Sequence, residues 1–273
     1  MAYLFIKKSF GKNILIAILL FFSLCLPRQS KAWGLLGHRI VGQIADAHLS
    51  KKAKKSIAEI MGNESIAMCS NWADFIKSDS SYNYLSKWHY VNLVTGLNKQ
   101  QVEEYLHNDS LINIFTKVNW LVAELKKKEL AKETKQFYLK LLIHFIGDMH
   151  QPMHVGRPDD QGGNRIRVLW FREQKNLHQV WDEALIDFQQ LSYTEYAAAI
   201  NFSTPEQRKG WQLSPISDWV FESYQYAEQI YADIKNPEEK LSYQYNFKYK
   251  SILESQLLKG GIRLAGLLNE IYK

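Results

Sequence analysis

His144-Phe-Ile-Gly-Asp148-Met-His150-Gln-Pro152-Met-His154 is the stretch from which the fold and chemistry of this chain are best approached. It gathers three of the eight histidines and one aspartate within eleven residues. His144 and Asp148 are four residues apart, so on a helix they project from the same face. Pro152 cannot continue a helix, so His154 is expected on the loop that follows. Because imidazole and carboxylate bind zinc where cysteine is absent, the stretch predicts a metal site at a helix end.

A second His-x-x-x-Asp pair, His178 and Asp182, occurs on another predicted helix. Taken singly, a buried histidine bonded to an aspartate is the commoner explanation of such a pair. Two pairs that flank a further histidine favour metal binding instead. Asp74 and His89 lie in aromatic surroundings that are more often core than substrate platform. His38 is either a further ligand or an ordinary residue at a helix start.

The first 32 residues have the pattern of a cleaved secretory signal. Three lysines precede an apolar run at 14–26, which is too short to span a membrane comfortably. Ser30-Lys31-Ala32 then places small residues where signal peptidase requires them, so the mature chain is expected to begin at Trp33. The alternative is a retained membrane anchor. A new terminus matters chemically, because an α-amine with a pKa near 8 can deprotonate and bind a metal.

Removal of the signal changes the charge and cysteine arguments. The net charge of +6 falls to +1, because residues 1–32 hold five basic residues and no acidic one. The basic pI is therefore not evidence for nucleic-acid binding. Cys25 leaves with the signal and Cys69 remains alone, so no internal disulfide can form. Residues 33–273 are long enough to bury a core as one domain.

The mature chain has mostly helical periodicity. Apolar residues recur at helical spacing in several segments, and caps or breakers separate them. Gly162-Gly163-Asn164 interrupts the pattern, and alternation over 165–170 predicts a short strand or hairpin. We therefore expect a single all-α domain with a small β-hairpin. Helices are predicted over 37–49, over 109–126 and from a cap at Thr134 into the stretch above. A fourth helix follows a cap at Asn176, and a fifth begins at Ser214-Pro215 and ends near 234. The last helix covers 243–272, with a possible break at Gly260-Gly261.

These residues match a family in order. The chain resembles the zinc-dependent single-strand-specific nucleases and 3′-nucleotidases, the S1/P1 nuclease family, over the whole mature region. The resemblance implies a compact helical domain like that of zinc-dependent phospholipases C. Missing disulfides suggest a bacterial member. The anchoring motifs are Trp33-Gly-x-x-Gly-His38, Trp72-Ala-Asp74, His89-Tyr-Val, His144-x-x-x-Asp148-x-His-Gln-Pro-x-His154, Gly162-Gly163-Asn164 and His178-x-x-x-Asp182.

The resemblance implies three zinc ions in one cleft, with the new amino terminus as a ligand. It assigns Asp74, His89, His144 and Asp148 to the first zinc; His154, His178 and Asp182 to the second; and the amine and carbonyl of Trp33 with His38 and a share of Asp148 to the third.

The same resemblance implies a substrate and a reaction. We expect a secreted or periplasmic monomer that cuts single-stranded DNA and RNA to 5′-nucleotides and removes 3′-phosphates, through attack of a zinc-bridged hydroxide on phosphorus. The implied catalytic residues are Asp74, Lys77 and Asp148. The implied substrate contacts are Lys77 and Asn164 at the phosphate and Tyr90 and Asn92 at the base.

Two other functions remain open from the sequence. A phospholipase C could use the same scaffold, but those enzymes typically have Glu where Asp182 stands. A non-catalytic zinc-binding protein would share the ligands without turnover. Asn92 also departs from the fungal pattern, which usually has Asp there. An amide both donates and accepts, so the base preference is not fixed by the sequence.

Overall fold

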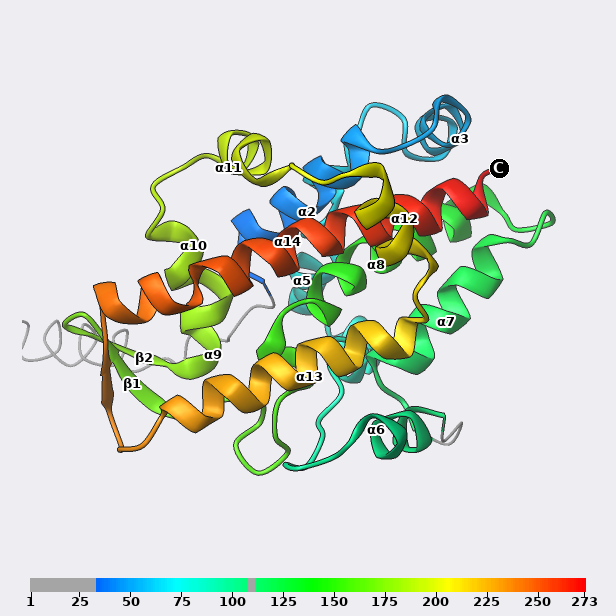
Figure 1. The fold of residues 1–273 in the computed structure, drawn as a ribbon. Helices are drawn as coiled ribbons and strands as arrows, with labels where there is room; N and C mark the ends of the chain where they lie inside the picture. Colours follow the sequence, from blue (N-terminus) through cyan, green and yellow to red (C-terminus); the bar gives the residue numbers. More distant parts are fainter. Residues whose placement is uncertain (1–32, 108–110) are drawn as a thin grey trace, which may run out of the picture. The chain divides into compact units, whose positions relative to one another are not determined.

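The computed structural model describes residues 33–107 and 111–273, and helices dominate this part of the chain (Figure 1). The described residues belong to one compact unit. The predicted all-α class is therefore confirmed. The predicted signal peptide, residues 1–32, lies outside the described residues.

The elements follow one another in a mainly helical order. The α-helices are α2 (Leu35–Ala47), α3 (Lys51–Met61), α4 (Ile66–Cys69), α5 (Trp72–Phe75), α6 (Lys99–Leu106), α7 (Ile114–Leu125), α8 (Lys132–Met149), α9 (Leu177–Gln179), α10 (Leu185–Asp187), α11 (Tyr193–Ile200), α12 (Pro205–Leu213), α13 (Ile216–Asp233) and α14 (Tyr243–Ile271). The 3₁₀ segments are η1 (Ile76–Ser78), η2 (Ser80–Trp88) and η3 (Pro152–Val155). A π-helical turn, η4, covers Val180–Ala184. The strands are β1 (Arg167–Trp170), β2 (Glu173–Asn176) and β3 (Glu239–Leu241).

Helix α8 lies in the centre of the described unit. Every residue from Leu141 to Met149 is buried, so this half of the helix has no solvated face. Helices α2, α5, α7 and α14 all pack against it. A helix that is apolar around most of its circumference belongs in a core. The consequence is that its two polar residues, His144 and Asp148, are carried into the core with it.

Helix α14 runs alongside α2, and small residues allow the close approach (Figure 1). A Cβ added to Gly261 would lie 2.5 Å from the Cβ of Ile44 and 3.0 Å from the carbonyl oxygen of Val41. The predicted break at Gly260-Gly261 is wrong, because α14 is continuous from Tyr243 to Ile271. The glycines serve helix packing instead of helix termination.

The small sheet is larger than the predicted hairpin. Strands β1 and β2 pair antiparallel, with Trp170 opposite Glu173, as the alternation indicated. Strand β3 joins the other edge of β1 in parallel, and Leu241 pairs with Trp170. The hairpin prediction is confirmed, and the third strand comes from the segment between α13 and α14.

The predicted caps had mixed outcomes. Asn176 caps α9 with a capping box, and its side chain accepts from Gln179 N at 2.7 Å. The Thr134 cap is wrong, because α8 begins at Lys132 with Ala131 before it. Ser214 closes α12, and Pro215 is the N-cap of α13. Of these predicted caps, Asn176 is the one whose side chain bonds the first turn of its helix.

A buried polar cluster joins α8 to α13 and α14. Arg263 Nη1 lies 2.9 Å from His150 Nε2, and Arg263 Nη2 lies 2.8 Å from Glu222 Oε2. Lys259 also pairs with Glu222. Burial and the Arg263 charge lower the pKa of His150 to about 3. His150 is therefore neutral, accepts at Nε2 and donates from Nδ1 to Ile146 O at 2.7 Å.

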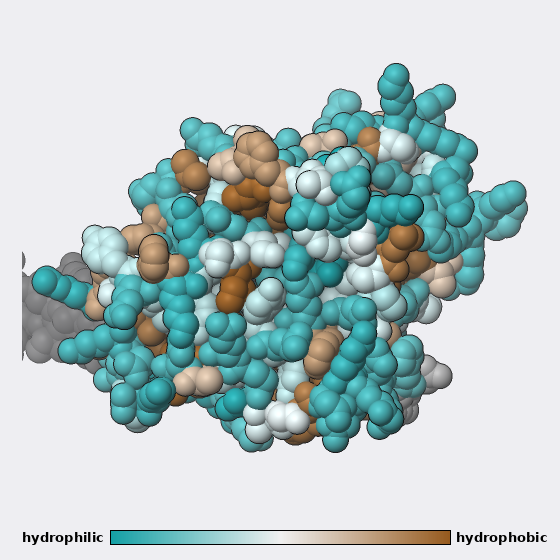
Figure 2. Space-filling view, viewed as in Figure 1, coloured by the Kyte–Doolittle hydropathy of each residue, from teal (hydrophilic) through white to brown (hydrophobic). Residues whose placement is uncertain are grey.

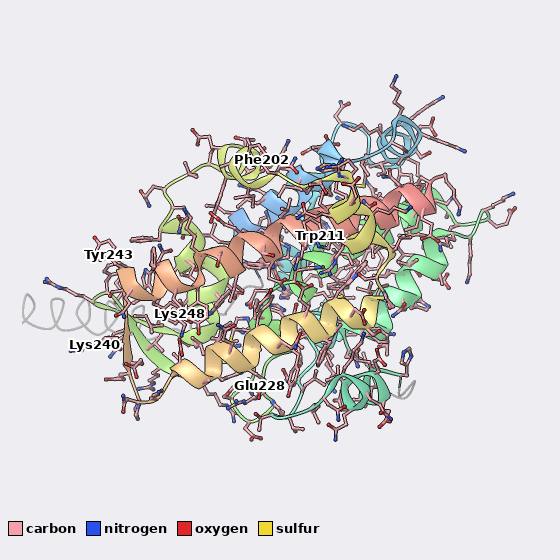
Figure 3. All side chains as sticks on the ribbon, viewed as in Figure 1. Phe202, Trp211, Glu228, Lys240, Tyr243 and Lys248 are labelled. Atoms are coloured by element: carbon pink, nitrogen blue, oxygen red, sulfur yellow. The ribbon has the colours of Figure 1, made fainter. Side chains whose placement is uncertain are left out.

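Ion pairs also tie the surface helices together. Figure 3 shows Lys248 on the N-terminal half of α14 and Glu228 on α13. Lys248 pairs with Asp233 at the end of α13. Arg157 Nη2 lies 3.1 Å from Glu228 Oε1. The face in Figure 2 is mostly hydrophilic, and its hydrophobic residues form small separate patches. Among the described residues, none of the helices combines the length and the apolar character that crossing a membrane requires.

The contact of α14 with α2 can be tested with two helical glycines. Gly261→Ala should lower the free energy of unfolding by about 1–3 kcal/mol, because the new methyl group overlaps Ile44. Gly210→Ala on α12 is the matched control, since a Cβ there meets nothing within 4 Å. It should raise stability by about 0.5–1 kcal/mol. Urea unfolding measures both; equal shifts would contradict the packing role of Gly261.

Candidate metal centre

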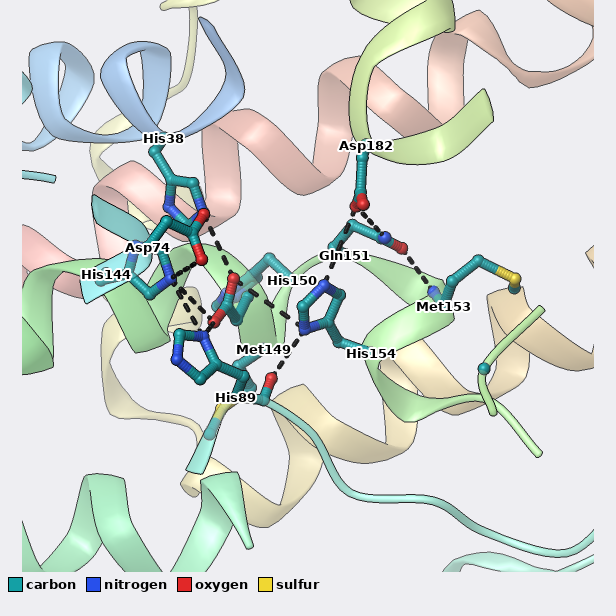
Figure 4. A network of polar contacts seen from close by, with 12 residues as sticks. His38, Asp74, His89, His144, Met149, His150, Gln151, Met153, His154 and Asp182 are labelled. Atoms are coloured by element: carbon teal, nitrogen blue, oxygen red, sulfur yellow. Dashed lines mark hydrogen bonds and ion pairs between the residues drawn. The ribbon is translucent and has the colours of Figure 1, made fainter. Parts of the chain in front are cut away.

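All the side chains predicted as metal ligands are buried, and they converge beside the C-terminal end of α8. Figure 4 labels six of them: His38, Asp74, His89, His144, His154 and Asp182. They come from segments far apart in the sequence. Their sources are α2 for His38, α5 for Asp74, the residue after η2 for His89, α8 for His144 and Asp148, η3 for His154, α9 for His178 and η4 for Asp182.

The carboxylate of Asp148 touches imidazoles from three elements. Its Oδ1 lies 3.2 Å from His38 Nε2. Its Oδ2 lies 2.8 Å from His89 Nδ1 and 3.2 Å from His144 Nε2. Asp74 Oδ1 approaches the same imidazole of His144 to 3.7 Å. Two carboxylates and three rings therefore surround one small region, as Figure 4 shows.

A second group of ligand atoms lies beside the first. His178 Nε2 is 3.2 Å from Asp182 Oδ2, and His154 Nε2 is 3.8 Å from Asp182 Oδ1. Asp182 stands in the π-helical turn η4, which replaces the regular helix predicted around this pair. The two side chains still project together. Single π turns inside helices often occur at functional sites.

The described residues contain three groups whose ligand atoms lie within 4.8 Å of one another. Every predicted side-chain ligand belongs to at least one group. His144 belongs to two, whereas the resemblance gives it to the first zinc alone. The groups are Asp74, His89 and His144; His38, His144 and Asp148; and His154, His178 and Asp182.

Backbone carbonyls fix the protonation of three of the rings. His144 Nδ1 lies 2.7 Å from Ser70 O, His154 Nδ1 2.7 Å from His89 O, and His178 Nδ1 2.6 Å from Gly162 O. A carbonyl oxygen only accepts, so Nδ1 must be the donor in each ring. In the neutral ring the Nε2 lone pair is then free for a metal.

The backbone conformation of Gly162 makes the contact with His178 possible. Gly162 has φ 64°, a conformation that L side chains rarely adopt, and a Cβ there would lie 2.3 Å from Met153 O. This conformation directs its carbonyl oxygen to His178. Gly162, in the predicted break at Gly162-Gly163, therefore orients the ring of His178 through its carbonyl oxygen.

Unpartnered polar atoms show that the residues fit zinc. Among the described residues, His154 Nε2, His38 Nε2 and Asp148 Oδ1 are buried with no hydrogen-bond partner. Buried polar atoms without partners are costly, and a cation at the crossing of their lone pairs removes that cost. Imidazole and carboxylate ligands without thiolates suit zinc.

Burial and neighbouring charges shift the pKa values of the groups in the centre in different directions. Burial raises the pKa of Asp148, but His144 and His154 outweigh it and hold that pKa well below its usual range. Burial lowers the pKa of His154, but Asp148 and Asp182 outweigh it and raise that pKa to about 9. Burial and Lys77 lower the pKa of His89 to about 4. Protons and metal ions thus compete for the same atoms.

The other predicted site residues lie around this cluster. Lys77 Nζ is 2.6 Å from Asp74 Oδ1. Tyr90 and Asn92 line a pocket of about 420 Å³. Asn164 donates its amide to Gln161 O at 2.9 Å and so is not aimed at the ligands. Trp33 is fully buried, and the next residue, Gly34, donates to the carbonyl of Asp182 at 2.6 Å.

Two neighbouring residues, His150 and Gln151, lie outside the predicted ligand set. His150 faces Arg263 on the other side of the segment. Gln151, for which the sequence predicts no role, donates to Asp182 Oδ1 at 2.5 Å. The only signal for Gln151 was its place between Asp148 and His154.

Comparison with known proteins gives the family. The family model described as S1/P1 Nuclease matches residues 33–273. The chain belongs to the S1/P1 nuclease family. It is 29% identical to Endonuclease 4 of Arabidopsis thaliana over 88% of this chain and 89% of that protein. It is 28% identical to Nuclease P1 of Penicillium citrinum over 88% of this chain and 98% of that protein. Nuclease S1 of Aspergillus oryzae is 27% identical over 59% of this chain and 56% of that protein.

Membership settles the general class of the protein. S1/P1 nucleases are zinc-dependent hydrolases with single-strand endonuclease and 3′-nucleotidase activity. The prediction of an enzyme of this class is confirmed, and so is the helical fold. The three buried His/Asp groups supply ligands suited to the metal on which the family depends.

Zinc should stabilise the folded chain, because it binds atoms that converge only in the native state. Saturating zinc should raise the unfolding temperature by about 10 °C, and a chelator should reverse this. Calorimetry measures the shift. Asp148→Asn keeps the shape but removes the shared charge, so its zinc-induced rise should be smaller. An unfolding temperature of the wild type that is the same with and without zinc would contradict the metal centre.

Proposed function

We propose that this chain is a secreted or periplasmic phosphodiesterase that holds three zinc ions, cuts single-stranded DNA and RNA to 5′-nucleotides, and removes 3′-phosphates. The observation that carries the proposal is the presence of three adjoining ligand groups around Asp148 in a chain of this nuclease family. The names of the relatives, nucleases and endonucleases, support nucleic acid as the substrate.

We assign the metals to ligands as the family resemblance implies, and the three groups of buried ligand atoms support this assignment. Zinc, when bound, lowers the pKa of water and polarises phosphoryl oxygens. Asp148 carries the charge that two of the sites share, which is consistent with its contacts through both oxygens. The proposed ligands are Asp74, His89, His144 and Asp148; His154, His178 and Asp182; and Trp33, His38 and Asp148.

Lys77 holds the substrate phosphate from the rim of the centre. Its side chain is 29% exposed while that of Asp74 is 1% exposed, so the ammonium group lies between the buried ligands and solvent. A cation there stabilises the negative charge that grows on a phosphoryl group during substitution. Asn164 contacts the phosphate as well, once its amide exchanges its bond to Gln161 for the substrate.

Tyr90 and Asn92 receive the base beside the scissile phosphate. Both line the same pocket, and the intervening Val91 donates its N–H to His154 O at 2.9 Å. The pocket is thereby held at a fixed position relative to a proposed zinc ligand. Tyr90 is 38% exposed, so its ring is accessible for stacking on a base.

Cleavage before Trp33 produces the third site. The family match begins at Trp33, and the bond from Gly34 to the Asp182 carbonyl holds this segment against the centre. These observations support a mature chain that begins at Trp33. We propose that this chain acts as a secreted monomer without a membrane anchor.

The activity is tested on the processed chain with zinc. A single-stranded oligonucleotide should be cut much faster than its duplex, and 3′-AMP should release phosphate. Asp148→Asn should lose more than about 100-fold in kcat/KM, because two zinc sites share that carboxylate. Lys77→Met should lose roughly 100-fold in kcat.

Three outcomes of these assays would contradict the proposal. The first is intact single-stranded nucleic acid and intact 3′-AMP after incubation with the zinc-loaded chain. The second is hydrolysis of phosphatidylcholine in preference to single-stranded DNA, which would favour the phospholipase. The third is bound zinc without turnover in the wild type, which would favour a non-catalytic zinc protein.

The terminal amine has its own test. A mature chain with one extra alanine before Trp33 should bind one zinc fewer, because its first amine is displaced from the centre. Metal analysis of the extended and the native chain measures the difference. Equal zinc content and equal activity in both chains would show that the terminus is not a ligand.

A further inference from the structure

Gln151 makes contact with three of the proposed ligands through its backbone and side chain. Its N–H donates to Asp148 O at 3.0 Å, and its carbonyl accepts from His154 N at 2.9 Å. Its side-chain Nε2 donates to Asp182 Oδ1 at 2.5 Å. Residues of the first, second and third proposed sites thus all bond to one fully buried residue, and its side chain bonds to Asp182 (Figure 4).

The orientation of the Gln151 amide is fixed. Its Oε1 accepts from Met153 N at 2.5 Å, where only an oxygen can accept. Nε2 must therefore face Asp182, and the amide cannot be reversed without losing both bonds. Because all four polar groups of the residue are engaged, its position is set by the segment that carries His154.

The bond from Gln151 gives the two carboxylate oxygens of Asp182 different partners. Oδ1 receives the Gln151 donor, and Oδ2 lies 3.2 Å from His178 Nε2. A hydrogen bond on one oxygen fixes the plane of the carboxylate and leaves the other oxygen oriented toward the neighbouring ligand. Ligating carboxylates generally need such a partner, and its loss typically costs 10–100-fold in metal affinity or activity.

We propose that Gln151 is a positioning residue for the second zinc and that it acts by orienting the carboxylate of Asp182. This inference rests on the proposed three-zinc centre and assigns a role to a residue outside its ligand set. The side chain has no path to the reacting atoms except through Asp182, because its other bond goes to the backbone of Met153.

A second buried glutamine supplies the matched control. Gln256 on α14 is also fully buried. Its Nε2 donates to His150 O and to Ser223 Oγ, both at 2.9 Å, and neither belongs to a proposed ligand. Gln256→Met therefore removes a buried amide of the same size, close to the same segment, without touching the zinc ligands.

The experiment compares Gln151→Met with Gln256→Met. Zinc content is measured after equilibration with a graded series of chelator concentrations, together with the unfolding temperature of the metal-free proteins. Both variants should unfold at lower temperature than wild type. Gln151→Met should release one zinc at roughly 10–100-fold lower chelator strength than wild type, while Gln256→Met should release its zincs as wild type does.

Two results would overturn the inference alone: wild-type zinc affinities in Gln151→Met, or an equal loss in Gln256→Met. A wild-type chain that binds no zinc would overturn the proposed function as well. Should Gln151→Met not accumulate as folded protein, Gln151→Asn replaces it. That variant keeps the amide but withdraws it by one methylene group, and the same release of one zinc is expected.

Discussion

The buried carboxylate of Asp148 is the constraint on which the rest of this structure depends. It stands in the last turn of α8, where the helix dipole is unfavourable for a negative charge. It is also completely buried, which by itself would favour the neutral acid. The neighbouring imidazoles of His144 and His154 maintain its charge. An anion held in this way attracts cations strongly, which is the property that a shared metal ligand needs.

Much of the helical packing serves to bring partners to this carboxylate. His38 reaches Asp148 from α2 because Gly147 leaves room, since a Cβ there would lie 2.6 Å from His38 Nδ1. The ring of His38 then stacks on that of His144, with centroids 3.9 Å apart. On the opposite flank, Gly261 brings α14 against α2. Small residues therefore set the helix spacings, and these spacings set the ligand positions.

The sequence predicted the parts of the site that are local. The four-residue spacing placed His144 beside Asp148 and His178 beside Asp182, and both pairs are in contact. Spacing alone could not relate Asp74, His89 or His38 to these pairs, because tertiary packing brings them together. Only the family resemblance predicts that those three residues join the pairs.

The errors in the fold have a similar origin. Gly260-Gly261 has the composition of a helix break, but its role depends on α2, more than two hundred residues earlier in the chain. The third strand is short and polar, and its pairing with β1 is parallel and distant, so no alternation signals it. A local pattern records what a segment prefers by itself and not which neighbour it meets.

The contrast between His150 and Gln151 shows how a proline sets the backbone and side-chain direction of the residue before it. His150 keeps a helical conformation, with φ −93° and ψ 0°, and it lies two residues past Asp148, so it points away from the ligands toward α14. Pro152 disfavours the helical region for the residue before it. Gln151 is accordingly extended, with φ −90° and ψ 115°, and its side chain reaches Asp182. Histidine is the residue type that more commonly binds a metal. Here the backbone conformation before Pro152 instead directs the glutamine side chain to Asp182, a proposed zinc ligand.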